Sequence, residues 1–338
     1  MQSFINMNIA IISEIGNFTK YPRNFENART DVAWSIALDA VSVPADSHLI
    51  KKYIESFTSF KKFDLAIIIP GKNKPYLEIN FIREYFADKV TMMQEGPNWY
   101  WQDYDIKGQF NFYNALRECD FILCHNSADK KYYKGITNLE CLVMPSLMIE
   151  DTIKNVVPKR RDAEGIVIGG NFCSWYGGMD SFIVSASSRK EWSTGDNLIP
   201  IFAPSMGRKK EDEDYIPDIT HLPYCSWMEW INQLASKAKI GVHLMRTHAA
   251  GTFALNCSFL GIPCVGYEGL DTQDNLHPYT TVRLGNTSQA VDIIKKLANP
   301  GFYEMCSEET KHLYDSHYSE SAFKNRFINK LNNLVNEN

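Results

Sequence analysis

One segment of the chain, Lys239–Gly269, combines residue types that can hold a phosphate. It reads KIGVHLMRTHAAGTFALNCSFLGIPCVGYEG, which predicts a strand ending at His243, a loop, and a helix that opens near Gly251. A glycine at a helix start lets an anion approach the free backbone N–H groups, and the helix dipole favours negative charge there. Arg246 and His248 in the same loop can add charge-assisted hydrogen bonds. The segment predicts a diphosphate site, although an ordinary strand–loop–helix with a surface arginine also explains it.

A second glycine-rich loop follows the strand predicted over Glu164–Gly170. The chain there reads GGNFCSWYGG and then enters a predicted helix, Met179–Ser188. Glycines allow the backbone to approach a ligand closely, but turns alone would also explain them. Because the loop lacks the G-x-G-x-x-G fingerprint, the sequence does not predict a dehydrogenase dinucleotide site.

Two loops nearer the start of the chain are candidates for binding a second substrate. The loop after the strand predicted over Asn8–Ser13 carries Gly16, Asn17, Arg23 and Arg29. After the strand that begins at Lys89, Glu95 is followed by aromatic residues that include Trp99 and Trp101. A carboxylate at Glu95 can accept a hydroxyl proton, and the indole rings can stack on a sugar or a base. The alternative is a loop whose aromatic residues pack on the core while Glu95 caps the next turn.

Buried strands alternate with amphipathic helices along the whole chain, which predicts parallel sheets covered on both faces. The polar stretch 151–164 interrupts this pattern and is interpreted as a linker. We therefore predict an α/β protein with two tandem doubly wound Rossmann-like domains and a cleft between them. The first domain covers 1–150, the second covers 165–320, and a last helix is predicted over 321–338.

Composition narrows the class further. The 338 residues are 44% hydrophobic and 22% charged with a net charge of -5, which excludes a disordered chain and a basic nucleic-acid domain. No apolar run is long enough to span a bilayer, and the start lacks a basic leader region. The eight cysteines include no CxxC pair, so we expect reduced thiols, a cytoplasmic protein and no zinc. Of two DxD triplets, the one ending at Asp214 is interpreted as a solvated charge run and the one ending at Asp105 stays ambiguous.

The segment 239–269 resembles the nucleotide-sugar site of the retaining family 4 glycosyltransferases, which have the GT-B fold. Their pattern is an acidic residue, Gly-x-Gly, a second acidic residue eight positions after the first, and then a stop glycine with Pro-Val. The equivalent positions here are His248, Gly251, Asn256, Gly261 and Pro263, so both acidic residues are replaced.

The resemblance implies roles for individual residues. The second acidic residue of the family holds the donor ribose, which the Asn256 amide can do, and the first lies near the donor sugar, which makes His248 a catalytic candidate beside Glu95. The family's phosphate-gripping Arg and Lys correspond to Asn171 and Tyr176, so Arg246 or Arg208 would replace that clamp. The implied donor-binding set is Gly170, Asn171, Tyr176, Arg208, Tyr224, Arg246, Gly251, Thr252 and Asn256.

The resemblance implies a transferase that moves a sugar from a nucleotide-diphosphate sugar, a UDP-sugar, to a hydroxyl, with no metal and no further cofactor. The resemblance also implies that the first domain binds the acceptor and that the helix over 321–338 returns to that domain. The acceptor partner is a glycan, a small molecule or a hydroxymethylated DNA base, since phage DNA glycosyltransferases share the GT-B fold. A phosphate-tracking groove would be formed by Lys51, Lys52, Lys61, Lys62, Lys72, Lys74, Lys130, Lys131 and Lys134. The alternatives are a sugar-nucleotide epimerase or an inactive nucleotide-binding module of the same fold. A periplasmic-type binding protein would need a secretory signal.

Overall fold

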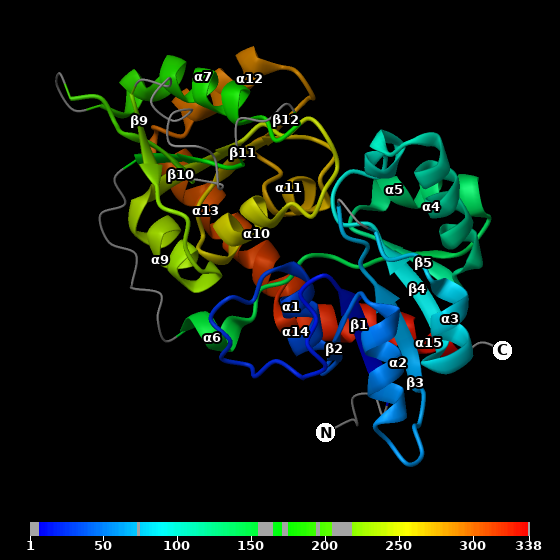
Figure 1. The fold of residues 1–338 in the computed structure, drawn as a ribbon. Helices are drawn as coiled ribbons and strands as arrows, with labels where there is room; N and C mark the ends of the chain where they lie inside the picture. Colours follow the sequence, from blue (N-terminus) through cyan, green and yellow to red (C-terminus); the bar gives the residue numbers. More distant parts are fainter. Residues whose placement is uncertain are drawn as a thin grey trace. The chain divides into compact units, whose positions relative to one another are not determined.

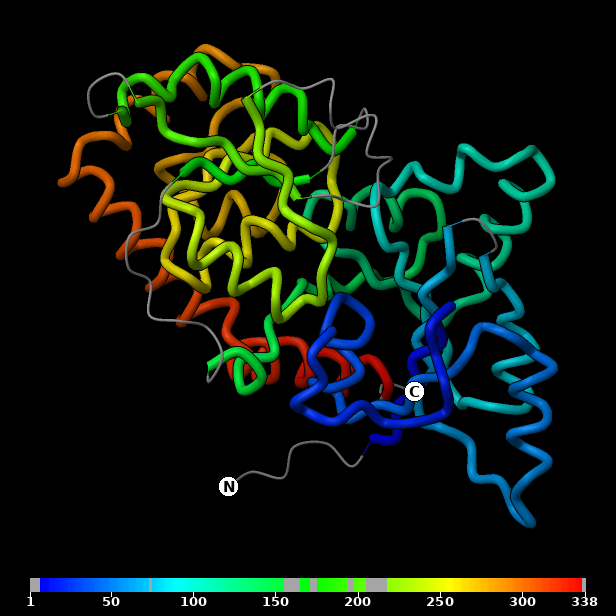
Figure 2. The backbone as a smooth tube through the Cα atoms, turned by 60° about the vertical axis from the view of Figure 1, so that its left-hand side comes forward, coloured from blue at the N-terminus to red at the C-terminus, as the bar shows by residue number. Residues whose placement is uncertain are grey.

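The computed structural model describes residues 7–72, 75–154, 165–170, 175–193, 197–204 and 218–336. The chain divides into two compact units, one formed by Met1–Ile149 with Glu320–Asn338 and the other by Glu150–Ser319. Most of the expected linker, 155–164, lies outside the described residues. Each unit contains a six-stranded parallel sheet with helices packed against it (Figures 1 and 2). The architecture is α/β with two Rossmann-like domains.

Unit 1 has the strand order β2-β1-β3-β4-β5-β6. Its strands are β1 (Ile9–Ser13), β2 (Val41–Pro44), β3 (Phe63–Ile68), β4 (Ala87–Met93), β5 (Phe121–Cys124) and β6 (Cys141–Val143). Its helices are α1 (Thr30–Ala37), α2 (Ser47–Glu55), α3 (Ile79–Tyr85), the 3-10 turn Tyr100–Asp103, α4 (Ile106–Glu118) and α5 (Ser127–Thr137).

Almost every residue of β1 and β3 is apolar and buried, as strands covered on both faces require. One face packs on α2, α3, α4 and α5, with Ile50, Ile82 and Phe112 in its core. The helix α1 contacts β1 and β2, and none of its buried residues belongs to that core. The sheet is thus covered from both sides.

The end of the chain belongs to unit 1. It consists of α14 (Glu320–Phe323), a π-helical turn over Lys324–Ile328 and α15 (Asn329–Asn336), and it lies beside the blue segments of unit 1 in Figures 1 and 2. Arg23 donates to both carboxylate oxygens of Glu320 at 2.8 and 2.7 Å. Lys324 binds the same carboxylate at 2.8 Å. These contacts lower the pKa of Glu320 against the effect of its burial. The ion pairs tie the loop after β1 to the C-terminal helices.

Unit 2 has the strand order β12-β11-β10-β7-β8-β9. Its strands are β7 (Gly165–Ile168), β8 (Ile201–Pro204), β9 (Ile219–Leu222), β10 (Ala238–His243), β11 (Cys264–Tyr267) and β12 (Thr281–Val282). Its helices are α6 (Glu150–Lys154), α7 (Gly178–Ser188), the 3-10 turn Arg189–Trp192, α9 (Trp227–Lys237), α10 (Thr252–Phe259), α11 (Asp271–Leu276), α12 (Thr287–Lys296) and α13 (Pro300–His317).

Neighbouring residues of β7 point into two different cores. Ile166 and Ile168 pack with residues of α7 and α12, whereas Val167 packs with residues of α9 and α10. Helices therefore cover both faces of this sheet, so its polar chemistry is confined to the strand ends.

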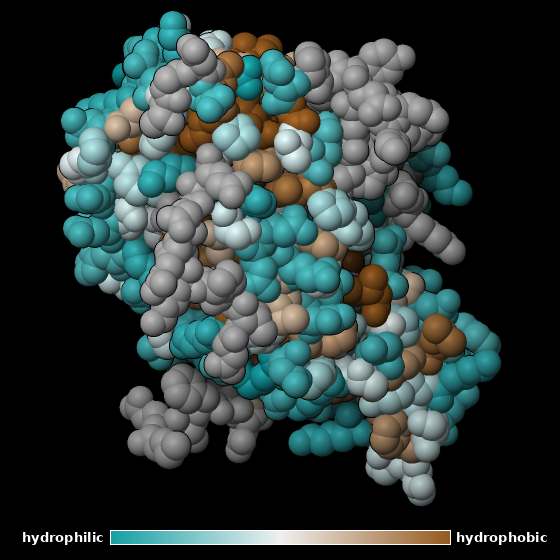
Figure 3. Space-filling model, turned by 90° about the vertical axis from the view of Figure 1, so that its left-hand side faces the viewer, coloured by the Kyte–Doolittle hydropathy of each residue, from teal (hydrophilic) through white to brown (hydrophobic). Residues whose placement is uncertain are grey.

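Hydrophilic residues cover most of the face in Figure 3, and hydrophobic residues gather near the top of that view, at the height of α7 and α12 in Figure 1.

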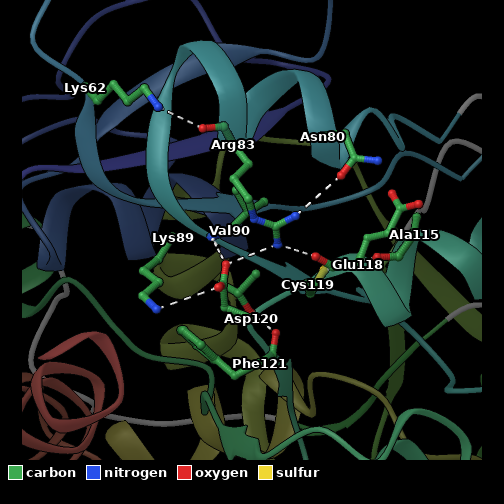
Figure 4. A network of polar contacts seen from close by, with 11 residues as sticks. Lys62, Asn80, Arg83, Lys89, Val90, Ala115, Glu118, Cys119, Asp120 and Phe121 are labelled. Atoms are coloured by element: carbon green, nitrogen blue, oxygen red, sulfur yellow. Dashed lines mark hydrogen bonds and ion pairs between the residues drawn. The ribbon is translucent and has the colours of Figure 1, made fainter. Parts of the chain in front are cut away.

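A polar network at the amino ends of β4 and β5 holds unit 1 together (Figure 4). The Asp120 carboxylate accepts the Val90 N–H at 2.8 Å and pairs with Arg83 at 3.3 Å and Lys89 at 3.8 Å. Arg83 also donates to the carbonyl oxygen of Glu118. One carboxylate thus joins the starts of two strands to the ends of α3 and α4.

We expect Asp120→Ala to lower the free energy of unfolding by about 1–3 kcal/mol, because it leaves the Val90 N–H and the Arg83 guanidinium without their shared partner. Glu55→Ala is the matched control, since the exposed Lys51–Glu55 pair at 3.9 Å should contribute less than about 1 kcal/mol. Urea unfolding of both variants checks this. Equal losses would show that the network adds nothing.

Candidate functional site

The strand order of unit 2 reverses direction between β7 and β10. These neighbouring parallel strands end at Ile168 and His243, and the chain leaves them toward opposite edges of the sheet. Open α/β sheets bind ligands beyond the carboxyl ends of the strands at such a switch point. The two loops that the sequence singled out, after Gly169 and before Gly251, both begin here.

Each of these loops ends at a helix that starts on a left-handed glycine. Gly177 precedes α7 with φ 71°, and Gly251 precedes α10 with φ 63°. Both N-cap residues are glycines, which supply no side-chain cap, and backbone N–H groups at such helix starts can bind an anion. A Cβ atom on Gly177 would lie 1.9 Å from the Leu244 carbonyl oxygen, so the two loops touch. The predicted helix start at Gly251 is confirmed.

His243 adds a polar group at the same strand ends. Its side chain is 6% exposed, and neither ring nitrogen has a hydrogen-bond partner among the described residues. Burial lowers its pKa to about 4, so the imidazole is neutral near pH 7. A Cβ atom on Gly170, whose φ is 72°, would lie 3.3 Å from Nε2. In the sequence, His243 is the last residue of an apolar run, and nothing in its spacing marks it as a site residue.

Arg246 is held by a carboxylate rather than left free for a phosphate. Its Nε and Nη2 atoms lie 2.8 and 2.7 Å from Oδ2 of Asp180, in the first turn of α7. The Asp180 contact raises the pKa of Arg246. Tyr267 at the end of β11 is close to both, and burial followed by the Asp180 charge raises its pKa. The predicted cation is present at the switch point, but its charge is largely compensated.

His248 packs on the loop after β11. A Cβ atom on Gly269, with φ 110°, would lie 2.8 Å from His248 Nε2, so only a glycine leaves room for the ring. The Gly269 N–H in turn donates to the Asp274 carboxylate. Burial raises the pKa of Asp274, while this hydrogen bond and the nearby His248 oppose the rise. The Gly-x-Gly pattern given above is incomplete in this segment, because Ala249 stands where its first glycine would be.

The remaining residues that were predicted to bind the donor lie in different surroundings. With the Asn256 amide oriented to satisfy both ends, Oδ1 accepts from Trp230 Nε1 at 3.1 Å and Nδ2 donates to the Thr252 carbonyl at 3.1 Å. This buried amide therefore supports the packing of α9 on α10. Thr252 is exposed at the first position of α10, and Tyr224 is 67% exposed before α9. Tyr176 stacks on its neighbour Trp175 at 3.8 Å. The predicted positions Asn171 and Arg208 lie outside the described residues.

Unit 1 has its own switch point, between β1 and β3. A Cβ atom on Gly71, after β3, would lie 1.8 Å from a carboxylate oxygen of Glu14, after β1. The Lys72 amine lies 5.0 Å from the centre of the Tyr100 ring. Charged and aromatic side chains therefore meet at the carboxyl ends of these strands.

Glu95 follows β4 and faces the start of α1. The Thr30 hydroxyl donates a hydrogen bond to it, which lowers its pKa. Surrounding protein and then the Asp31 carboxylate raise the pKa of Glu95 to about 7. Solvent still reaches this exposed side chain and screens part of the shift. A carboxyl that titrates near neutral pH is suited to proton transfer.

The basic and small residues predicted in the loop after β1 have mostly structural contacts. A Cβ atom on Gly16 would lie 2.0 Å from the Val43 carbonyl, so this glycine permits close packing on β2. Asn17 accepts from the Thr19 N–H and hydroxyl at 3.3 and 2.7 Å, which forms a local turn. Arg23 binds Glu320 as described above. Arg29 is the N-cap residue of α1 and makes no side-chain cap.

The aromatic platform divides into two parts. Trp101 stacks on Phe112 at 5.6 Å and packs against the core of unit 1, as the alternative interpretation of this loop expected. Trp99 stacks on Tyr100 at 6.0 Å. Asp105, from the ambiguous DxD triplet, accepts the Gly108 N–H at 2.7 Å and caps α4.

The described residues contain neither a metal-ligand cluster nor a membrane-spanning helix. Nowhere in the described ranges do three or more His, Cys, Asp or Glu side chains gather so that they could hold a metal ion. No helix in the part of the chain that the structure describes has the length and apolar character needed to cross a bilayer.

Solved structures with the same arrangement identify the fold as GT-B. Sucrose-phosphate synthase from Thermosynechococcus elongatus matches with a TM-score of 0.66 at 10% identity, over 98% of this chain and 100% of that one. HepE from Anabaena, solved with UDP and glucose, matches with a TM-score of 0.65 at 9% identity, over 97% and 100%. The trehalose-6-phosphate synthase OtsA matches with a TM-score of 0.63 at 9% identity, over 90% and 78%. No family model and no curated protein matches the sequence.

Proposed function

We propose that the protein is a glycosyltransferase that moves a sugar from a nucleotide-diphosphate sugar, a UDP-sugar, to a hydroxyl group. The observation that carries this proposal is the pair of uncapped helix starts, at Gly177 and Gly251, beside each other at the switch point of unit 2. Two amino-terminal helix dipoles at one place suit the two phosphates of such a donor. The GT-B fold and the UDP bound in HepE support the choice of donor.

In the proposed reaction, the acceptor oxygen forms a bond to the anomeric carbon of the donor sugar. The bond from that carbon to the phosphate oxygen breaks, and the nucleoside diphosphate leaves with its electron pair. The N–H groups at the starts of α7 and α10 stabilise the negative charge that develops on the diphosphate. Unit 1 binds the acceptor, and Glu95 accepts the hydroxyl proton. His248, placed by Gly269 and Asp274, is assigned to the donor sugar.

The positions of the lysines favour a sugar or small-molecule acceptor over DNA. Lys61 and Lys62 precede β3 whereas Lys72 follows it, which separates them by about 20 Å along a six-residue strand. Lys51 and Lys134 are engaged with Glu55 and Glu140, and Lys74 lies outside the described residues. A groove that follows a phosphate backbone would need these charges on one face.

The second candidate is a nucleotide-binding module or an epimerase that transfers no sugar to an acceptor. The observation that favours it is the Asp180 carboxylate that neutralises Arg246, since a transferase gains from a free cation beside its leaving diphosphate. Under this alternative the nucleotide sugar binds, but no acceptor accelerates the release of nucleoside diphosphate.

A thermal-shift series with UDP-, GDP-, ADP- and dTDP-sugars tests the donor assignment. One nucleotide family at 100 times its Kd should stabilise the protein by about 2.7 kcal/mol. The effective donor is then incubated with and without acceptors while free nucleoside diphosphate is measured. Release that depends on acceptor supports transfer, and binding without such release supports the second candidate. Absence of any shift contradicts both candidates.

A further inference from the structure

Three buried side chains at the carboxyl edge of the unit 1 sheet have polar atoms that bind no other residue in the described ranges. They are Ser13 at the end of β1, Gln94 after β4 and His125 after β5, exposed by 4%, 5% and 4%. The Ser13 hydroxyl, Gln94 Oε1 and both His125 ring nitrogens make no hydrogen bond with any described residue. Buried polar atoms of native proteins are nearly always paired. Three such groups at one sheet edge can hydrogen-bond a polar ligand.

The first two turns of α1 link these groups to one another. The Ser13 hydroxyl lies near the Asp31 carboxylate and lowers the pKa of Asp31. The two side chains do not meet the geometry of a hydrogen bond. Thr30 binds Glu95, and Gln94 Nε2 donates to the Glu95 carbonyl at 2.9 Å. One turn further along the helix, the Trp34 ring stacks on His125 at 5.3 Å. The unpaired atoms and the two carboxyls thus form a single cluster, which we call the α1 cluster: Ser13, Asp31, Gln94, Glu95 and His125.

The charges of the α1 cluster disfavour an anion. Burial and surrounding protein raise the pKa values of Asp31 and Glu95, and no basic residue is among the causes that oppose this rise. Burial lowers the pKa of His125 to about 4, against the effects of Asp129 and the Met144 backbone, so its ring is neutral near pH 7. A neutral imidazole offers one donor and one acceptor, as hydroxyl groups require. A phosphate would instead meet uncompensated carboxylates.

We propose that the α1 cluster binds an uncharged polyhydroxyl acceptor, a sugar or polyol that carries no phosphate and no carboxylate. Its hydroxyl groups donate to Asp31, Glu95 and Gln94 Oε1, and they pair with the neutral His125 ring and the Ser13 hydroxyl. Glu95, which solvent reaches, marks the open side of the cluster. The inference rests on the proposed function and narrows its acceptor to one chemical class.

Matched acceptor pairs test the charge preference. The full-length protein, with the nucleotide sugar that stabilises it, is supplied with glucose or glucose 6-phosphate, with glycerol or glycerol 3-phosphate, and with a hydroxymethylated oligonucleotide. We expect kcat/KM for the better neutral compound to exceed that of its phosphorylated partner, and of the oligonucleotide, by at least about 10-fold. A preference for a phosphorylated compound or for the oligonucleotide overturns the inference while leaving sugar transfer intact. Failure of every acceptor overturns the inference together with the transferase assignment.

The variant Gln94→Leu separates binding from a structural role. Leucine removes the Oε1 atom, which has no partner among the described residues, and also the hydrogen bond from Nε2 to the Glu95 carbonyl. These two changes act on stability in opposite directions, so the melting temperature should stay close to that of the wild type. We expect the acceptor KM to rise by about 10-fold, while kcat at saturating acceptor, the donor KM and the nucleotide-induced thermal shift stay within 2-fold of the wild type. Glu26→Gln, in the exposed loop after β1, is the control and should change none of these values. An unchanged acceptor KM in Gln94→Leu overturns the inference.

Discussion

Thr252→Glu should weaken donor binding by about 10²-fold while making the protein more stable. Thr252 is the exposed first residue of α10, directly after Gly251. A glutamate there stabilises the helix dipole by about 0.3–1 kcal/mol. The same charge repels a diphosphate bound at that helix start, and two like charges about 5 Å apart at a protein surface cost about 3 kcal/mol. Titration calorimetry with the nucleotide sugar and thermal unfolding measure the two opposite effects.

Two matched variants control this experiment. Thr252→Gln has the length of the glutamate without its charge, so the donor Kd should stay within about 3-fold of the wild type. Thr287→Glu places the same charge at the exposed first position of α12, in the same unit but after the edge strand β12. It should stabilise its helix similarly and leave donor binding unchanged. If Thr252→Glu binds the donor normally, the diphosphate does not lie at α10.

The backbone of this site could be predicted from the sequence because its signals are local. Continuous apolar runs predicted β1, β7 and β10, and Gly251 predicted where α10 begins. The elements missed include β2, a four-residue strand, the short helices α6 and α11, and the polar helices α2 and α5, which have few buried residues. For α2 the sequence held one usable signal, Asp46, whose side chain caps the helix by accepting the Leu49 N–H at 3.0 Å.

The side-chain partners at the site could not be predicted, because they come from distant parts of the chain. Asp180 lies 66 residues from the Arg246 that it neutralises. Trp230 belongs to a helix whose packing decides that the Asn256 amide is buried. His243 ends the apolar strand β10 and His125 directly follows β5. The sequence alone does not show that their ring nitrogens make no hydrogen bond with the residues the structure describes. Composition and spacing fix where a loop emerges, whereas pairing depends on the tertiary structure.

Glu95→Gln should lower kcat by about 10²- to 10⁴-fold, the usual contribution of a general base. Glutamine keeps the size of the side chain and the hydrogen bond with Thr30 but cannot accept a proton. Donor binding should be unchanged, because the nucleotide is assigned to unit 2. Glu26→Gln is the control for a lost carboxylate and should retain full activity. Activity in Glu95→Gln within 3-fold of the wild type would assign proton transfer to another group.

The pH dependence of the same variant gives a second readout with a defined sign. The pKa of Glu95 is raised by the surrounding protein and by Asp31, the one charged group among its causes. In the wild type, kcat/KM should therefore fall as the pH drops through about 7, because the proton-accepting carboxylate is lost, and Glu95→Gln should lack this fall.

The thermal stability of the wild type should instead fall as the pH rises. The folded protein binds the Glu95 proton more tightly than the unfolded chain does, so ionisation of Glu95 destabilises the wild type as the pH rises from about 4.5 to about 7. Glu95→Gln should consequently melt at a higher temperature than the wild type above pH 7, and the difference should disappear below pH 4.5. If Glu95 only capped a turn, Glu95→Gln would instead lower the melting temperature of the protein. The combination of lost activity and gained stability at neutral pH is the result expected of a group held for catalysis.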